Sequence, residues 1–319
     1  MAPENRTVSF YHYDPSEAAA AVFCALFGLS LIYSTFMVIR TGAWVWTVQL
    51  VAILMEVVGY VSRIASAQRT DSLDLYAVQF CVIILAPVLM AGVVYVVFGR
   101  IVFHVVPEQE RTTRLLWVPA RWITPIFVTF DIVSLVIQLL GAIVVSSTKA
   151  TDENAVGKLE TGKNVALVGL AVQMAAFGLF SVIAVRFHFT SKRFEASLRP
   201  GLEGSREGKK AAVILRPSRE INPHWRHLLY VINGSCLLIL ARSIFRIVEF
   251  AEGPSGRVMQ EEYFMYVLDT LPMFLVVFSF TIFFPGTYLP FMGFRVPKHP
   301  AGARELPGEN ESAIALREV

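Results

Sequence analysis

Five charged residues stand within the long apolar segments of this chain: Glu56, Asp131, Arg242, Arg246 and Asp269. A charge at bilayer depth costs about 2.5–3.5 kcal/mol on insertion scales, so such residues normally pair with one another or line a polar path. Carboxylates and guanidiniums at that depth could bind the charged head group of an amphiphile while its alkyl chain stays in lipid. We therefore expect the function of the protein to lie at these residues.

The spacing of the polar residues gathers them onto a few helix faces. Glu56, Tyr60 and Arg63 stand at i, i+4 and i+7, which places them on one face of a helix and allows a local ladder from carboxylate to guanidinium. A run of two arginines and a glutamate with the same spacing begins at Arg242. The full set of candidate binding or translocation residues is Glu56, Tyr60, Arg63, Gln79, Asp131, Gln138, Gln173, Arg242, Arg246, Glu249 and Asp269.

A purely structural interpretation competes with binding. Two arginines and three acids can pair with each other and fix helix packing, with one carboxylate left over. Interhelical hydrogen bonds in membranes stabilise by only about 0.6 kcal/mol on average. This is much less than the insertion cost of the five charges, so packing alone does not explain them. We therefore expect a polar cavity in which an ammonium group replaces an arginine partner at Glu56, Asp131 or Asp269. The side chains expected to point into the bundle and meet near its outer end are Glu56, Arg63, Arg242, Arg246, Glu249 and Asp269.

The composition requires a membrane around these residues. The mean hydropathy is +0.56, and 55% of the 319 residues are hydrophobic against 17% charged. A soluble protein could not cover that much apolar surface. Backbone groups in lipid must be satisfied within their own segment, and no segment shows the alternation of a barrel strand, so the predicted fold is all-α. Seven helices long enough to cross about 30 Å of hydrocarbon are predicted at 18–39, 43–61, 76–98, 123–145, 164–187, 227–248 and 265–288.

Lysine and arginine residues in the connections predict the orientation. With the N-terminus outside, 19 of the 28 fall in cytosolic segments and 7 in outer ones, so the C-terminus is expected in the cytosol. This divides the chain into an extracellular segment over 1–17, a membrane domain over 18–288 and a cytosolic tail over 289–319. Prolines, glycines and glutamates in the tail predict disorder. Asn5 begins an outward-facing glycosylation sequon.

The positions of histidine and lysine argue against several functions. All six histidines and all seven lysines lie outside the predicted spans or at their edges. Neither a zinc site at depth nor a retinal Schiff base is therefore expected. We expect no enzyme activity, no metal or other cofactor and no nucleic-acid partner. The expected partners are membrane lipids and an amphiphilic small-molecule substrate, and the oligomeric state is left open.

Prolines and aromatic residues within the spans each have two interpretations. Pro87 and Pro272 mark either kinks beside a cavity or ordinary tolerated prolines. Aromatic residues near span ends, among them Tyr95 and Phe284, are expected to be interface anchors rather than substrate platforms.

A succession of short motifs runs through all seven spans. In order these are Tyr13-x-Pro15-Ser16; Glu56-x-x-Gly59-Tyr60-x-x-Arg63; Gln79, Ala86-Pro87, Ala91, Tyr95 and Gly99-Arg100; Phe127, Asp131 and Gln138-x-x-Gly141; Gly169-Leu170-x-x-Gln173; Arg242-x-x-Phe245-Arg246-x-x-Glu249; Gly256 with Glu262; and Tyr266-x-x-Asp269. The succession resembles the fungal lipid-translocating exporter family, named after resistance to aminocholesterol. The chain departs from the family pattern at Ala20, where many members carry Asn, and at Phe284, where His is common.

The resemblance implies a seven-helix protein of the fungal plasma membrane or endomembranes. It implies export or flipping of sphingoid long-chain bases, or tolerance of toxic amphiphiles, and the family also includes members associated with porphyrin uptake. A lipid-responsive receptor or stress sensor is the alternative, because seven helices, an outer N-terminus and a basic 188–226 connection are also the layout of a G-protein-coupled receptor. A transporter redistributes its ligand between leaflets, whereas a receptor only binds it.

Overall fold

The computed structural model describes residues 16–68, 73–106, 120–148, 155–192, 224–253, 256 and 261–289. Within these ranges all regular elements are helical, and seven helices are long and apolar enough to cross a membrane. The predicted all-α fold with seven spans is thereby confirmed. Asn5 and nearly all of the segments predicted as the N-terminal extension and the C-terminal tail lie outside the described residues.

The helices mostly extend beyond the predicted spans. The predicted segments 76–98 and 164–187 lie within helices of 33 and 36 residues. Hydropathy marks the part of a helix that lies in hydrocarbon, whereas backbone hydrogen bonding continues into the interface. The first six spans are formed by α1 (Glu17–Thr41), η1 (Trp44–Trp46) with α2 (Thr47–Gln68), α3 (Leu73–Val105), α5 (Ala120–Ser147), α6 (Ala155–Thr190) and α8 (Arg226–Glu252).

The seventh span is not the single helix predicted over 265–288. It begins with α10 (Glu262–Met265), passes through the π-helical turn η3 (Tyr266–Thr270) and continues as α11 (Leu271–Ile282). Phe283 and Phe284 then leave the helix before α12 (Pro285–Tyr288). A proline lies beside each irregularity: Pro272 follows η3 and lacks a helical N–H, and Pro285 disfavours the helical conformation at Phe284, which is extended.

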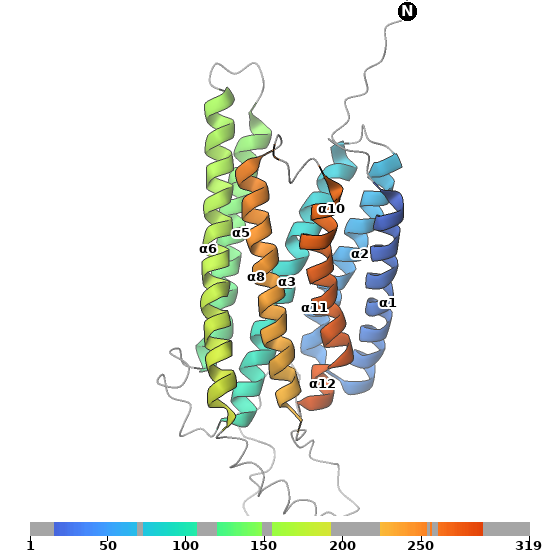
Figure 1. Cartoon of the computed structure of the whole chain (residues 1–319), viewed down its shortest axis with the longest axis vertical. Helices are drawn as coiled ribbons and strands as arrows, with labels where there is room; N and C mark the ends of the chain where they lie inside the picture. Colours follow the sequence, from blue (N-terminus) through green and yellow to red (C-terminus); the bar gives the residue numbers. More distant parts are fainter. Residues whose placement is uncertain are drawn as a thin grey trace, which may run out of the picture.

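The seven spans form a closed ring in chain order. Each of α1, α2, α3, α5, α6, α8 and α11 packs on the next, and α11 returns to α1. Helices α3 and α8 also touch each other across the middle of the ring. Figure 1 shows α5 and α6 on one side of this central pair and α1, α2 and α11 on the other. The central pair therefore divides the bundle into two compartments, called here the α2/α11 side and the α5/α6 side.

Aromatic side chains fill the interior on both sides. Tyr95 packs against Phe127, Phe177 and Phe180 with ring centroids 4.6–5.8 Å apart. On the other side Phe284 packs edge-on against a tryptophan of η1. Tyr95 and Phe284 are 0% and 1% exposed, so the prediction that they are interface anchors is wrong. Position near a span end did not reveal that they face inward.

Glycines bring α5 and α6 into close contact. A Cβ on Gly141 would lie 2.6 Å from the carbonyl oxygen of Gly162 and 2.7 Å from the backbone nitrogen of Ala166. A Cβ on Gly169 would lie 2.7 Å from Cγ of Gln138. Small residues of this kind allow helix backbones in membranes to approach closely. This contact holds two side chains of the site described next.

Candidate functional site

The predicted charged residues lie inside the bundle. Their exposed fractions range from 1% for Asp269 to 8% for Arg242 and Glu249. Glu56 and Asp131 lie near the middle of α2 and α5, and the other charged residues lie nearer the end of the bundle at which α1 starts. The expectation that these side chains point inward is met for Glu56, Arg63, Arg242, Arg246, Glu249 and Asp269.

Asp269 is the centre of an ion-pair cluster on the α2/α11 side. Its Oδ1 lies 2.6 Å from Nε of Arg242 and accepts a hydrogen bond of 3.1 Å from Nε of Arg246. Its Oδ2 accepts a second bond from Nη2 of Arg246. Arg246 also donates to Glu249 Oε2 at 2.9 Å, one turn along α8. Asp269 sits on the π-helical turn η3, which supplies the local geometry that carries it to the two guanidiniums.

A backbone carbonyl of α3 that lacks its helical hydrogen bond joins Arg242 of this cluster to α3. Pro87 has no N–H, so the carbonyl of Ile83, four residues earlier, loses its normal helical partner. Arg242 takes the place of that partner and donates from Nη2 to the Ile83 oxygen at 3.3 Å. The proline predicted as a possible kink thus provides a backbone acceptor for a buried arginine.

Arg63 pairs with a residue that the sequence analysis did not select. Its Nη2 lies 2.7 Å from Oε1 of Glu262, and its Nε donates to the Tyr266 hydroxyl at 3.2 Å. Glu262 also accepts from the backbone N–H of Ser16 at 2.8 Å, which ties the start of α1 to α10. The predicted ladder from Glu56 to Arg63 along α2 is therefore wrong, because Arg63 turns to α10 instead.

Glu56, Tyr60 and Gln79 complete the α2/α11 side. Tyr60 is fully buried and its hydroxyl donates to Thr270 Oγ1 at 2.7 Å. Glu56 is 2% exposed and has no hydrogen bond or ion pair among the described residues; its charged neighbours are Arg242, Asp269 and Arg246. Gln79 is buried on α3. Glu56 is thus the carboxylate of the α2/α11 side that is left over after the arginines have paired.

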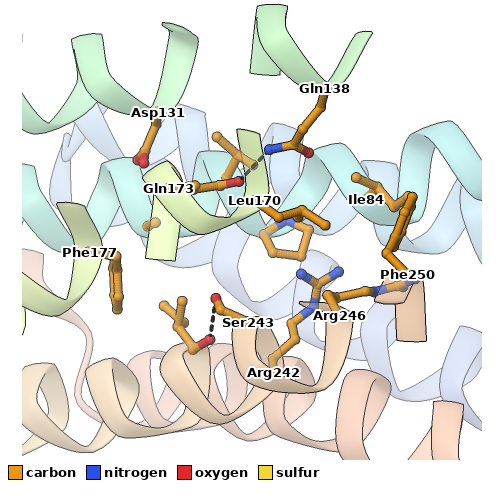
Figure 2. A pocket seen from close by; sticks show the side chains of 14 residues that line it. Ile84, Asp131, Gln138, Leu170, Gln173, Phe177, Arg242, Ser243, Arg246 and Phe250 are labelled. Carbon is orange, nitrogen blue, oxygen red and sulfur yellow. Dashed lines mark hydrogen bonds between the residues drawn. The ribbon is translucent and has the colours of Figure 1, made fainter. Parts of the chain in front are cut away.

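A cavity on the α5/α6 side holds the remaining candidates. Its lining comes from α3, α5, α6 and α8, with Asp131, Gln138 and Gln173 on one wall and Arg242 and Arg246 on the other (Figure 2). The rest of the lining is largely apolar and comprises Ile84, Pro87, Val88, Ala91, Leu170, Phe177, Ile239, Ser243 and Phe250. The two arginines thus border both compartments, since they face Asp269 on one side and the cavity on the other.

Asp131 is the buried charge of this cavity without an ion-pair partner. It lies near the middle of α5 and is 3% exposed, yet no basic side chain among the described residues pairs with it. The Tyr95 hydroxyl of α3 is its polar neighbour and interacts with the carboxylate, although the pair does not reach ideal hydrogen-bond geometry. Burying an unpaired polar group is costly, and such a group in a native structure needs an explanation.

Gln138 and Gln173 meet about two helical turns along α5 from Asp131. Nε2 of Gln138 donates to Oε1 of Gln173 at 2.9 Å. Gly169, one turn before Gln173 on α6, allows this contact because it leaves room for the Gln138 side chain. The structure thus brings Asp131, Gln138 and Gln173 together, and separates them from Glu56, Tyr60 and Arg63.

Sequence reasoning missed four residues that complete these sites. Glu262 and Tyr266 are the partners of Arg63, and Thr270 is the partner of Tyr60. Tyr95 faces Asp131. Tyr95, Glu262 and Tyr266 stand in the quoted motifs, which was the available signal, whereas Thr270 does not. Among the residues that the structure describes, no group of three or more His, Cys, Asp and Glu side chains could hold a metal ion.

Comparison of the sequence with known proteins finds one matching family. The model of the family described as "RTA1 like protein" matches residues 49–292. The protein RTM1 of Saccharomyces cerevisiae is 31% identical over 72% of this chain, which covers 63% of that relative. Protoporphyrin uptake protein 1 of the same yeast is 28% identical, with 85% of this chain and 90% of the relative covered.

A third relative is named for a lipid. The sphingoid long-chain base transporter RSB1 of Saccharomyces cerevisiae is 27% identical over 73% of this chain and 62% of its own length. This chain therefore spans somewhat less than two thirds of RTM1 and of RSB1. No solved structure matches the chain.

Proposed function

Because this chain belongs to the RTA1-like family, we propose that it is a membrane transporter or translocator of amphiphilic lipids. The observation that carries the proposal is the cavity inside the seven-helix bundle, where Asp131, near the middle of α5, is a buried carboxylate that no basic side chain among the described residues pairs with. A polar group that must cross hydrocarbon needs such an interior site. The relative named as a sphingoid long-chain base transporter supports an amphiphile of that kind.

The charges around the cavity favour a cationic amphiphile. Arg242 and Arg246 are the guanidiniums there, and the buried carboxylates near them are Glu56, Asp131, Glu249 and Asp269. Acids therefore outnumber the arginines, and both arginines are already ion-paired. A positive head group balances this excess, as the ammonium of a sphingoid long-chain base would. A carboxylate-bearing porphyrin would add to it, so uptake of an anion is the less favoured alternative.

We place the protein in the plasma membrane, with an endomembrane as the alternative, and the N-terminus outside. The excess of lysine and arginine in the proposed cytosolic segments supports this orientation. The ion-pair cluster then lies in the outer half of the membrane and Asp131 near its middle. Export to the outer leaflet, and with it resistance to toxic amphiphiles, is the activity this arrangement favours.

Purified protein in liposomes tests the proposal. We expect it to redistribute a fluorescent long-chain base between the two leaflets without any other protein, at a rate above that of protein-free liposomes. A receptor or stress sensor would bind the base and leave its distribution unchanged. Binding without redistribution would therefore reject the transport proposal in favour of that alternative.

A further inference from the structure

Asp131 has the features of an anchor for a positively charged group. It is buried, it points into the cavity, and no basic side chain among the described residues pairs with it (Figure 2). The other acids are less available, because Asp269 already holds Arg242 and Arg246, Glu249 holds Arg246, and Glu56 does not line this cavity. A cation that enters the cavity therefore meets one carboxylate that no arginine occupies.

The glutamine pair adds a second and different recognition element. The bond from Gln138 Nε2 to Gln173 Oε1 uses one donor and one acceptor of the pair. Oε1 of Gln138 and the N–H groups of Gln173 remain, and no other hydrogen bond engages them in the described residues. A hydroxyl group both donates and accepts, so it complements this remaining acceptor and donor.

We propose that Asp131 and the Gln138–Gln173 pair form the head-group site for a long-chain amino alcohol, with the ammonium on Asp131 and a neighbouring hydroxyl on the two amides. Both walls carry apolar residues, such as Leu170 and Ile239, that suit the first carbons of an alkyl chain. A primary ammonium donates three hydrogen bonds, whereas a quaternary ammonium donates none. The site therefore selects primary amines that carry a hydroxyl.

The ion-pair cluster has a separate role in this arrangement. Glu56 and Asp269 lie beyond the two arginines, on the α2/α11 side, and the arginines hold Asp269. An ammonium would have to displace a guanidinium from Asp269 in order to bind there. The cluster instead fixes the positions of Arg242 and Arg246, which form the wall opposite Asp131 and keep cations near the carboxylate side.

The inference rests on the proposed function for its choice of ligand, but a binding measurement tests it independently of transport. Full-length protein in lipid nanodiscs is titrated with three compounds of equal chain length: sphinganine, octadecylamine and octadecyltrimethylammonium. We expect binding to weaken in that order. The step from sphinganine to octadecylamine should be roughly two- to tenfold, as for one ordinary hydrogen bond.

Three variants and one control test which residue binds the ammonium and which binds the hydroxyl. Asp131→Asn should weaken sphinganine binding by at least about tenfold, because a charged hydrogen bond is lost, and Asp131→Glu should restore part of it. Gln138→Leu should lower sphinganine binding to the level of octadecylamine and leave octadecylamine unchanged. Ser181→Ala is the control, because this buried α6 hydroxyl donates to the Phe177 carbonyl of its own helix and does not line the cavity. This variant should bind all three compounds like the unchanged protein.

Equal sphinganine affinity in Asp131→Asn and the unchanged protein would overturn the inference, as would equal binding of all three compounds. If Asp131→Asn does not fold, Gln138→Leu tests the inference: loss of the preference for sphinganine over octadecylamine supports it, and an unchanged preference overturns it. Failure of the proposed function gives a different pattern: the site binds sphinganine as expected, but liposomes show no redistribution. Redistribution that is as fast in Asp131→Asn as in the unchanged protein would leave transport standing and reject this head-group site.

Discussion

Asp269 holds two guanidiniums with one carboxylate, at 1% exposure. Desolvating charges is expensive, and removing one partner of a buried pair leaves the others without compensation. The sequence predicted Asp269 as a binding residue, and the structure shows that its charge is already used. We therefore expect the Asp269 carboxylate to contribute first of all to the stability of the bundle.

Asp269→Asn should destabilise the folded protein by about 3–5 kcal/mol, because Arg242 and Arg246 then remain buried with little compensation. Thermal unfolding in detergent or nanodiscs measures this. Glu262→Gln is the matched comparison. The Glu262 side chain is 13% exposed and forms an ion pair with one arginine, Arg63, rather than with two, so its loss should cost less than that of Asp269.

An Asp269→Asn protein that unfolds at the same temperature as the unchanged protein would show that the pairs contribute no net stability. The carboxylate could then be reassigned to ligand binding. This would support the original expectation that an ammonium exchanges for an arginine there.

Individual partners could not be predicted from the sequence. Helical spacing placed Glu56 and Arg63 on one face of α2, but the choice between Glu56 and Glu262 as the partner of Arg63 depends on where α10 lies. Likewise, the pairing of Arg242 with the Ile83 carbonyl requires α3 and α8 to touch across the ring. These contacts join residues about 160 to 200 positions apart, and periodicity carries no information about such distances.

The helices themselves were the most predictable level of the structure. Seven apolar segments gave the number, order and approximate positions of the spans, because lipid requires each segment to satisfy its own backbone. Helix ends beyond the hydrocarbon and the irregular start of the seventh span were not predicted. Both depend on local hydrogen bonding rather than on hydropathy.

The α5–α6 contact is an element-scale feature with a direct test. Gly141→Leu should destabilise the protein by about 1–3 kcal/mol or more, since overpacking forces side chains and backbone apart, and here the nearest atoms belong to the backbone. The two helices would separate, and the Gln138–Gln173 bond would lengthen. Thermal unfolding and sphinganine selectivity report these two effects.

Gly28→Ala on α1 is the control for that substitution. A Cβ there has nothing within 4 Å, and alanine is the better helix former by about 0.5–1 kcal/mol. We expect it to unfold at the same or a higher temperature. Equal behaviour of the two variants would mean that the close α5–α6 approach does not contribute to stability.

At the scale of the whole molecule, the closed ring with its central pair explains how one protein can hold two polar centres. Helix α8 supplies Arg242 and Arg246 to both compartments, and α3 faces both of them. A movement of α8 relative to α3 would therefore change the ion-pair cluster and the cavity together. The sequence indicated which residues are polar, but not that they separate into two groups.

The proposed orientation has its own test. Reporters fused after Val319 and within the 188–226 connection should both be cytosolic, and a tag before Met1 should be accessible on intact cells. The reason is the 19 to 7 distribution of lysine and arginine. Opposite accessibility of the two ends would reverse the membrane direction of every site proposed above.

The turn η3 lets the chain differ in length by one residue, but in one direction only. A π-helical turn accommodates one residue more than the same stretch of α-helix. Deleting one residue from Tyr266–Thr270 would therefore let the helix close regularly, and the segments on either side would keep nearly the same orientation. Only the residues of the turn would change their positions, and Asp269 would lose the local geometry that carries it to Arg246. Inserting a further residue would instead rotate α10 by about 100° about the helix axis, so that Glu262 would turn away from Arg63 and from the start of α1.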